Sequence, residues 1–520
     1  MTRPRWFGIL PLLPFVLLAA NPPSAEQKER IERGRKIYVE GASPSGGEIT
    51  AVMSDAGVEV PASAVPCASC HGRDGKGRPE GGVAPTDLSW PNLTKPYGLT
   101  HPGGRKHPAY DVRLLKRAIS LGIDPAGNAL HVAMPRFRMS LQDMEDLVAY
   151  LQQLGGGIEP GVGETALQIG VLLPPASAMG QAVRAALTAR FDQLNRRGGL
   201  YGRRLEPRFL EVPGPPEQRR AWAADFLERE RIFAGVACFL AGADAELAAL
   251  FEEKQIPLIG PFTLHPRESS PLGRYVFYLL SGVEVQGEVL VRFAAGRWQE
   301  KPRAAVVAPA TGDLDAAVEA AVKTAAAAGW PPPLVIRLQG SSGLQDLRRL
   351  VDGKADPVFF LGSGAEAAAL LQAADRLGWH PRFFATAAAA DNSLFSAPKA
   401  FDGRIFLALP TPPDGPAPEA AATYRALAAD AKLPADDLSA QLSALAAAEV
   451  LIEGLQRSGR EVNRERLVDR LETLRSFRSG LAPPVSYGPG RRLGARGAYV
   501  VRLALESKAF VREGEWIEME

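Results

Sequence analysis

The sequence predicts a multidomain protein in which an all-α domain precedes an α/β unit of two lobes. The chain has 520 residues, and single hydrophobic cores stop growing at about 250–300 residues. Glycines and prolines crowd into residues 155–163 without hydrophobic periodicity, as in an interdomain linker. Downstream, short apolar runs alternate with Ala-rich stretches of helical length. We therefore expect a signal peptide at 1–25, a first domain at 26–156, a linker at 157–165 and the two-lobed unit at 166–520.

Composition and charge exclude several classes of protein. Apolar residues make up 46% and charged residues 23% of the chain, unlike disordered or polytopic membrane chains. The 60 Lys and Arg residues nearly balance the 58 Asp and Glu residues, which leaves a formal net charge of +2. That balance predicts no nucleic-acid partner. Only three cysteines are present, so a disulfide scaffold is excluded.

The N-terminus has the layout of a secretory signal peptide. Arg3 and Arg5 precede a mostly apolar run at residues 6–20, and small residues follow it. The run is shorter than the roughly 20 residues that a membrane-spanning helix needs. We expect cleavage after Ala20 or Ala25 and delivery to the periplasm, with an uncleaved N-terminal anchor as the alternative. No later segment is predicted to span a membrane.

Cys67, Cys70 and His71 form the C-x-x-C-H arrangement of covalent haem attachment. Each thiol adds across one haem vinyl group, and the adjacent imidazole ligates the iron. A zinc half-site would need two more ligands at close spacing, and a redox C-x-x-C would need a thioredoxin-like setting. The third cysteine, Cys238, lies far away in an apolar run that predicts a buried, inert thiol. The sequence therefore predicts one covalently bound haem c.

The second axial ligand of the iron is expected downstream, and Met134 is the strongest candidate. Pro135 favours an extended conformation for the preceding residue, which places the thioether on a loop. Met139, just before a predicted helix, is an alternative ligand. The other alternative is bis-His ligation by a loop histidine, for which the candidates are His101, His107 and His131.

This region resembles a class I cytochrome c over residues 26–156. The resemblance rests on the order and spacing of an opening helix, the haem motif, a Met-Pro pair and a closing amphipathic helix, marked by Gly34, Arg35, Tyr38, Cys67 to His71, Met134-Pro135, Tyr150 and Leu151. It implies a low-spin haem, with His71 and Met134 as axial ligands, that shuttles single electrons between periplasmic donor and acceptor proteins. Residues 41–66 depart from the pattern, because they separate the first helix from the haem motif more widely than in small members of the family.

The downstream region predicts two α/β units. Strands are expected at 167–173, 233–240, 257–260 and 275–280 in the first, and at 304–308, 334–338, 358–361 and 383–385 in the second. Ala-rich helices are expected at 313–328 and 364–378. Ligands bind beyond the carboxyl ends of parallel strands, so two facing units predict a cleft between lobes.

This region resembles the periplasmic binding proteins of the branched-chain amino-acid receptor type over residues 166–520. The resemblance rests on the loop at 195–203, Gly235 leading to Ala241-Gly242, the strand at 257–260, Gln286-Gly287 and the closing segment 487–499. It implies a type 1 Venus-flytrap fold that closes on a small solute without catalysis. Lobe 1 is expected at 166–300 and 412–475, and lobe 2 at 301–411 and 476–520.

Six residues lie on loops expected at the cleft, and they are Ala241, Gly242, Thr263, Ser281, Glu284 and Asp313. Amino-acid binders of the family place hydroxyl side chains and backbone amides at the helix start after the third strand, to hold the ligand carboxylate. This chain has Leu-Ala-Gly-Ala there, at residues 240–243, so it offers backbone amides and no hydroxyl.

Together these features predict an exported c-type cytochrome that transfers single electrons and is fused to a domain binding a small ligand or redox partner. One alternative is a solute-binding protein of an uptake or sensing system with an accessory haem. A second alternative is a haem enzyme such as a peroxidase, which needs an open iron site.

Overall fold

The chain folds into two compact units, residues 1–157 and 158–520. The computed structural model describes residues 24–53, 57–77, 83, 85–101, 104–154, 159–267, 273–298, 302–310, 314–338 and 344–519. Residues 1–23 of the predicted signal peptide lie outside the described residues, so its cleavage stays a prediction.

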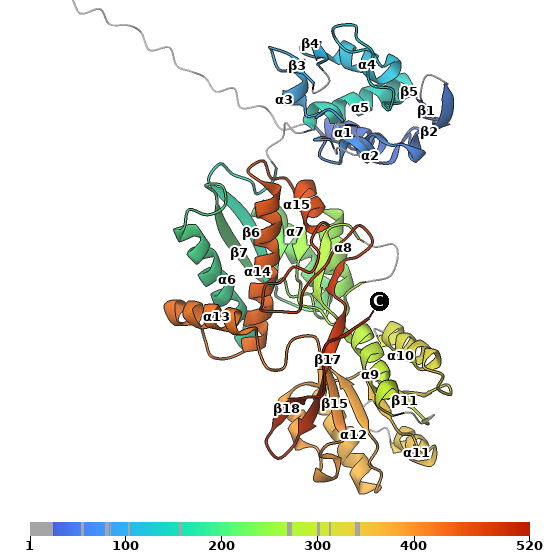
Figure 1. The fold of residues 1–520 in the computed structure, drawn as a ribbon, viewed down its shortest axis with the longest axis vertical. Coiled ribbons are helices and arrows are strands. Elements are labelled where there is room, and N and C mark those ends of the chain that lie inside the picture. Colours follow the sequence, from blue (N-terminus) through green and yellow to red (C-terminus); the bar gives the residue numbers. More distant parts are fainter. Residues whose placement is uncertain are drawn as a thin grey trace, which may run out of the picture. The chain divides into compact units, whose positions relative to one another are not determined.

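Helices make up most of the regular secondary structure described in the first unit (Figure 1). Its described residues contain α1 (Ala25–Glu40), α2 (Cys67–His71), α3 (Trp90–Leu93), α4 (Val112–Leu121) and α5 (Leu141–Gln153). The α5 helix begins where the sequence predicts, because the Ser140 side chain accepts a hydrogen bond from the Asp143 amide. Its apolar face, including Leu147 and Leu151, is buried in the core of the unit.

Short strands also occur in the first unit, so the description "all-α" is too simple. β1 (Thr50–Met53) pairs antiparallel with both β2 (Val58–Pro61) and β5 (Arg136–Arg138). A separate pair joins β3 (Leu99–Thr100) to β4 (Lys106–His107). Both β1 and β2 come from the segment 41–66, which the sequence had marked as unusually long for a cytochrome.

A glycine sets how closely α1 and α5 approach. A Cβ atom built on Gly34 would lie 1.9 Å from the Asp146 carbonyl oxygen, far inside van der Waals contact. Beside it, Arg33 Nε lies 2.7 Å from the nearly fully buried Asp146 carboxylate. This close crossing positions Tyr38, which is completely buried one turn further along α1.

The first lobe of the second unit is built on a six-stranded parallel sheet with the order β16-β10-β9-β8-β6-β7. Its strands are β6 (Ala166–Leu173), β7 (Arg204–Glu211), β8 (Ala234–Val236), β9 (Leu258–Ile259), β10 (Val276–Leu280) and β16 (Leu493–Ala495). The helices of this lobe are α6 (Ala178–Arg196), α7 (Pro216–Arg229), α8 (Asp244–Glu253), α13 (Pro418–Ala431), α14 (Leu438–Ser458) and α15 (Arg464–Leu471).

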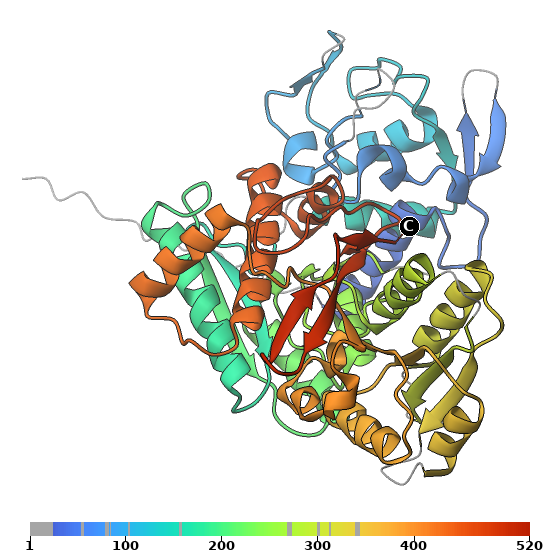
Figure 2. The same cartoon turned by 60° about the horizontal axis from the view of Figure 1, so that its bottom comes forward.

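The second lobe has a mixed sheet with the order β12-β11-β13-β14-β15-β17-β18. Its strands are β11 (Ala305–Pro309), β12 (Leu334–Leu338), β13 (Val358–Phe360), β14 (Phe383–Thr386), β15 (Ile405–Leu409), β17 (Gly497–Ala504), β18 (Ala509–Arg512) and β19 (Ile517–Glu518), the last paired with β17. Figure 2 draws the last strands of the chain, which include β17 and β18, in red. The helices are α9 (Val283–Arg297), α10 (Asp315–Ala327), α11 (Leu344–Asp352) and α12 (Gly364–Arg376). The strands and Ala-rich helices predicted in both lobes are therefore present.

Two expected lobe bounds need correction. Residues 283–297 were expected in the first lobe, but they form α9, which packs on α10 and on β14, β15 and β17 of the second lobe. The assignment of residues 476–520 to the second lobe is also wrong in part. β16 pairs with β10 at the edge of the first sheet, and Val485 and Tyr487 are buried in the core of the first lobe. Only from Gly497 does the chain join the second sheet, through β17. The cause is the apolar stretch at residues 493–495, which extends the first sheet before the chain crosses over.

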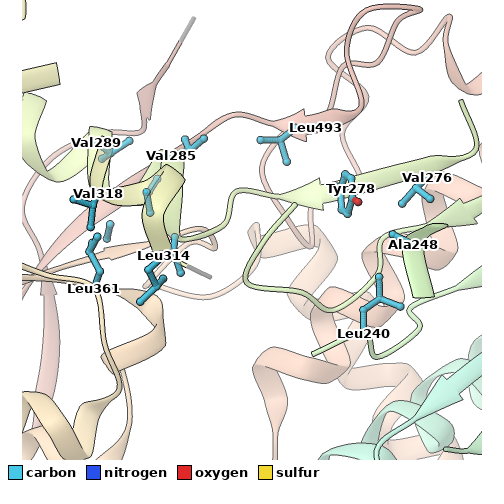
Figure 3. Close-up of a cluster of buried hydrophobic side chains, with 14 of the residues drawn as sticks. Leu240, Ala248, Val276, Tyr278, Val285, Val289, Leu314, Val318, Leu361 and Leu493 are labelled. Atoms are coloured by element: carbon cyan, nitrogen blue, oxygen red, sulfur yellow. The ribbon is translucent and has the colours of Figure 1, made fainter. Parts of the chain in front are cut away.

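Buried apolar side chains cover both sheets. Figure 3 shows one group around α9 and α10, with Val285, Val289 and Val318, and another group on the first lobe, with Tyr278 and Leu493.

Among the described residues, one later helix has the length and composition of a membrane span, which the sequence analysis did not expect. α14 is long and apolar enough by composition, yet 72% of the tested stretch is buried inside the unit, as in a core helix.

Part of the predicted linker packs on the second unit. The Glu159 carboxylate lies 3.4 Å from Arg464 Nε. A Cβ atom on Gly161 would lie 2.3 Å from the Arg231 carbonyl oxygen. The described residues from 159 onward are therefore fastened to the second unit instead of forming a free tether.

Replacing Gly34 by Ala should lower the free energy of unfolding of the first unit by about 1–3 kcal/mol, because the added methyl group forces α1 away from α5. Differential scanning calorimetry should show a lower transition temperature for the first unit and an unchanged transition for the second. Gly47→Ala is the matched control, since its Cβ atom would meet no atom closer than 3.7 Å. Equal melting of the two variants would contradict the role given to Gly34.

Candidate haem and ligand sites

The C-x-x-C-H motif forms the short helix α2, which places Cys67 and Cys70 one helical turn apart. The helix ends at Gly72, whose φ of 75° is in the left-handed region that favours glycine. The buried Tyr38 hydroxyl donates a hydrogen bond to the Gly72 carbonyl oxygen at 2.7 Å. The α1 helix thus fixes the end of the motif directly beside His71.

The His71 side chain is 7% exposed and has a defined orientation. Its Nδ1 atom lies 2.9 Å from the Thr86 carbonyl oxygen. A carbonyl can only accept, so Nδ1 carries the proton and Nε2 keeps its lone pair for a metal. Burial lowers the pKa of His71, which favours the neutral imidazole that a metal needs. The arrangement fits an axial ligand of haem iron.

Both cysteines of the motif are free thiols, as covalent attachment of haem requires. Cys70 is exposed, whereas Cys67 packs against the core of the first unit. Burial raises the pKa of the Cys67 thiol to about 12, so it stays protonated. Together with His71, these residues would hold a haem c through two thioether bonds and one iron ligand.

Met134 lies partly buried against the same core, on a turn that several contacts fasten. Its amide donates a hydrogen bond to the His131 carbonyl oxygen at 2.9 Å. The Met134 carbonyl oxygen accepts one from the Arg136 guanidinium. β5 begins directly after Pro135, and it pairs with β1, where Phe137 lies opposite Ala51. The segment 41–66 therefore braces the loop that carries Met134.

The competing axial ligands are placed differently. Met144 is buried in the core, while Met139 is partly buried and stays an alternative. Both ring nitrogens of His107 are engaged, Nδ1 by the Pro108 carbonyl oxygen at 2.8 Å and Nε2 by His101 Nε2 at 2.9 Å. This pairing argues against iron ligation by either histidine.

His101 has a second neighbour that favours its neutral form. Arg105 Nη2 lies 3.0 Å from His101 Nε2. Burial lowers the pKa of His101, and the Arg105 charge lowers it further. His131 is exposed on the loop before Met134.

In the second unit, three of the predicted cleft residues meet at the head of α8. Ala241 and Gly242 follow β8, and Thr263 follows β9. A residue absent from the prediction, Asp244, connects them. Its carboxylate accepts a hydrogen bond from the Gly242 amide at 2.9 Å and another from the Thr263 hydroxyl. An acidic residue in the first helical turn, after Gly-Ala, was the sequence signal for it.

The remaining cleft candidates lie elsewhere or cannot be placed. Ser281 is 4% exposed and donates its hydroxyl to the Gly497 carbonyl oxygen at 2.6 Å. It joins two segments where the chain passes between the lobes, and its role as a ligand contact stays a prediction. Glu284 lies half-buried in the first turn of α9. Asp313 lies outside the described residues.

A further contact, made by Gln286 where the chain passes between the lobes, was not predicted from the sequence. Gln286 is almost fully buried and donates to the Ser281 carbonyl oxygen at 2.8 Å, while its own Oε1 accepts from the Ala387 amide at 2.8 Å. The same side chain therefore links the crossing segment to the second lobe, which explains the burial of a polar residue at this point.

Comparison with known families agrees with both halves of the chain. Residues 166–509 match the family model described as periplasmic binding protein, and residues 58–155 match the model described as cytochrome c. Both resemblances read from the sequence are confirmed. A cytochrome c domain implies covalently bound haem c, in agreement with the geometry of α2. A comparison with curated proteins gives no match.

Solved structures similar to the second unit are solute-binding proteins. A fatty acid ABC transporter substrate-binding protein from Thermomonospora curvata is 17% identical, with a TM-score of 0.58 over 70% of this chain and 95% of that one. A branched-chain amino acid ABC transporter protein from Thermus thermophilus with bound valine is 19% identical, with a TM-score of 0.54. The match covers 69% of this chain and 97% of that one. An ABC transporter substrate-binding protein from Desulfitobacterium hafniense in complex with Leu is 18% identical, with a TM-score of 0.54. The match covers 68% of this chain and 100% of that one. The structural likeness shows the fold of the second unit.

Replacing Met134 by Ala should abolish the weak absorption band at about 695 nm that a methionine-to-iron bond gives in oxidised His/Met haem proteins. The visible spectrum of the purified holoprotein is the measurement. Met139→Ala is the control and should keep the band. If the band survives in the Met134 variant and disappears in the Met139 variant, Met139 is the ligand.

Replacing Ala51 by Pro should loosen the Met134 loop. β1 is the central strand of its sheet, so proline removes a ladder hydrogen bond on one side or the other. We expect cyanide to displace methionine about tenfold more readily, the equivalent of about 1.4 kcal/mol, roughly one hydrogen bond. Spectroscopic titration with cyanide measures this.

The control for that titration is Glu59→Gln, which breaks only an exposed ion pair with Arg138 on the same sheet. It should leave cyanide affinity unchanged. An Ala51 variant that folds and binds cyanide like the wild type would show that the sheet does not brace the loop.

Proposed function

Because the chain belongs to the periplasmic binding protein family and also carries a cytochrome c domain, we propose that it is a periplasmic electron carrier whose second unit binds a small solute or a redox partner. The observation that carries the first half is the His71 side chain, which is buried and bound through Nδ1 to Thr86, with Nε2 left for iron. The bound haem would supply the one-electron Fe(III)/Fe(II) couple.

The residues around the motif support electron transfer over catalysis. Met134 is packed against the core on a braced loop, so its thioether would close the second axial position. A closed iron needs no access for a substrate, and thioether ligation favours the ferrous form and hence a high potential. We propose His71 and Met134 as axial ligands and Cys67 and Cys70 as attachment points of a single haem.

The second unit supports solute binding through its topology. In each lobe the strand order reverses beside the first strand along the chain, which is β6 in one lobe and β11 in the other. Ligands of open α/β sheets bind at such points, beyond the carboxyl ends of the strands. The similar structures contain valine and leucine, so amino acids are the first solutes to examine. We propose that solute binding in this unit controls or directs electron transfer by the haem.

A second candidate function is a solute-binding protein of an uptake system with an accessory haem. The match to two ABC transporter proteins over 100% of their chains favours it. Export to the periplasm is part of both functions, since haem of this type is attached outside the cytoplasm and both families are typical of that compartment.

Redox titration of the holoprotein should give one haem per chain and a reversible one-electron transition. A solute that binds the second unit should change the midpoint potential or the rate of reduction by a small periplasmic-type electron donor. If a bound solute changes neither, the two units act independently and the uptake function gains support. Fast turnover of hydrogen peroxide by the resting protein would instead indicate an enzyme with an open iron site.

A further inference from the structure

We propose that His101 and His107 form a proton-binding site that regulates the haem unit. One shared proton holds the hairpin of β3 and β4 closed, and a second proton opens it and loosens the turn that precedes Met134. The inference goes beyond the proposed function, because it gives the haem unit an acid-sensitive control. Only its last step rests on that function, since it takes Met134 as an axial ligand.

The two imidazoles meet across the hairpin that joins β3 to β4. His107 ends β4 opposite Leu99 of β3 and is 5% exposed, while His101 directly follows β3 and is half-buried. Their Nε2 atoms lie 2.9 Å apart. Two lone pairs or two N–H groups would repel each other at this distance, so one proton lies between the two nitrogens.

The neighbouring groups decide which histidine carries that proton. His107 Nδ1 lies 2.8 Å from the Pro108 carbonyl oxygen, which can only accept, so Nδ1 is protonated. Arg105 Nη2 can only donate and lies 3.0 Å from His101 Nε2, so this nitrogen keeps its lone pair. The shared proton therefore belongs to His107 Nε2. All three contacts form together only when His107 is a cation and His101 is neutral.

Charged and titratable groups from several elements surround the pair. Arg105 lies in the hairpin itself, and its Nη1 donates to the buried Asp124 carboxylate at 2.6 Å. The Tyr110 ring, on the segment after β4, meets the His107 ring edge-on with the centroids 5.0 Å apart. Arg117 of α4 donates to the Asp124 carbonyl oxygen. Two guanidinium groups and one carboxylate thus give this place an excess of positive charge before a second proton is added.

A second proton would break the pair. It would add to His101 Nε2, which would then have no lone pair for Arg105 or His107, and the like charges would repel each other. The folded protein resists this proton, because burial and then the Arg105 charge lower the pKa of His101. The unfolded chain binds the proton more readily, so a falling pH lowers the stability of the closed hairpin.

The hairpin also holds the turn at residues 122–130. The Asp124 carboxylate, which Arg105 binds, accepts a hydrogen bond from the Asn128 amide at 2.9 Å. The Asn128 side chain in turn donates to a backbone carbonyl oxygen of β4 at 3.1 Å. Met134 follows this turn closely along the chain. Opening the hairpin removes both contacts, so acid loosens the segment that leads to Met134.

Long-range ¹H–¹⁵N NMR of the reduced holoprotein, with ¹⁵N-labelled histidines, reads the ring protonation directly. Near neutral pH we expect two ring protons on His107 and one, on Nδ1, on His101. As the pH falls, His101 should gain its second proton together with the opening of the hairpin. Two neutral rings at neutral pH, or a second proton on His101 without opening, overturn the inference whichever residue ligates the iron.

Acid titration of the oxidised holoprotein tests the link to Met134 through the methionine-to-iron band at about 695 nm. His101→Gln keeps an acceptor, the amide oxygen, that takes up no proton. We expect this variant to keep the band to about one pH unit lower than the wild type does. His101→Leu removes the acceptor and should lose the band at a higher pH than the wild type.

The matched control is His380→Gln, because His380 pairs with Asp375 at 2.8 Å in the second unit. It should titrate like the wild type. Loss of the band at the same pH in the wild type and in His101→Gln overturns the inference. If the wild type shows no such band at any pH, the proposed ligation by Met134 fails together with the last step of the inference, and the NMR titration still decides the proton site.

Discussion

The hydrogen bond from His71 Nδ1 to the Thr86 carbonyl oxygen is the interaction on which the first unit depends. It fixes the tautomer and the ring orientation, so the other imidazole nitrogen keeps its lone pair and could bind a metal. The surrounding elements maintain it: α1 crosses α5 closely enough at Gly34 to bury Tyr38, and the Tyr38 hydroxyl holds the backbone next to His71. The position of the five-residue haem motif therefore depends on contacts made by the helices around it.

The second unit obeys a different constraint, set by strand order. In each sheet the strand order reverses at one point, and the helices that follow the strands on its two sides begin at the same edge of the sheet. The first amides of each helix have no partner within the helix. In this chain the Asp244 carboxylate accepts from the Gly242 amide at the start of α8, and Glu366 completes a capping box with Ser363 at the start of α12. The buried Ser281 and Gln286 stabilise the place where the chain crosses between lobes.

Local signals predicted the parts of this structure that local chemistry determines. The haem motif, the start of α5 just after Met139 and the apolar strands of both lobes could be predicted, because spacing and periodicity decide them. Long-range pairings were not readable. Nothing in residues 50–53 indicates that they pair with the strand after Met134, and β16 reaches the first sheet only through a partner more than 200 residues away. Asp244 was missed because its role depends on Thr263, which another strand delivers.

The account of the first unit rests on Met134 as the second axial ligand, and proton NMR of the reduced holoprotein tests this most directly. With methionine methyl groups labelled by ¹³C, an iron-bound thioether gives one methyl signal shifted far upfield by the haem ring current. The account predicts a single such signal, which belongs to Met134. If no methionine signal is shifted, or if the shifted signal belongs to another methionine, the axial ligation described for this unit is wrong.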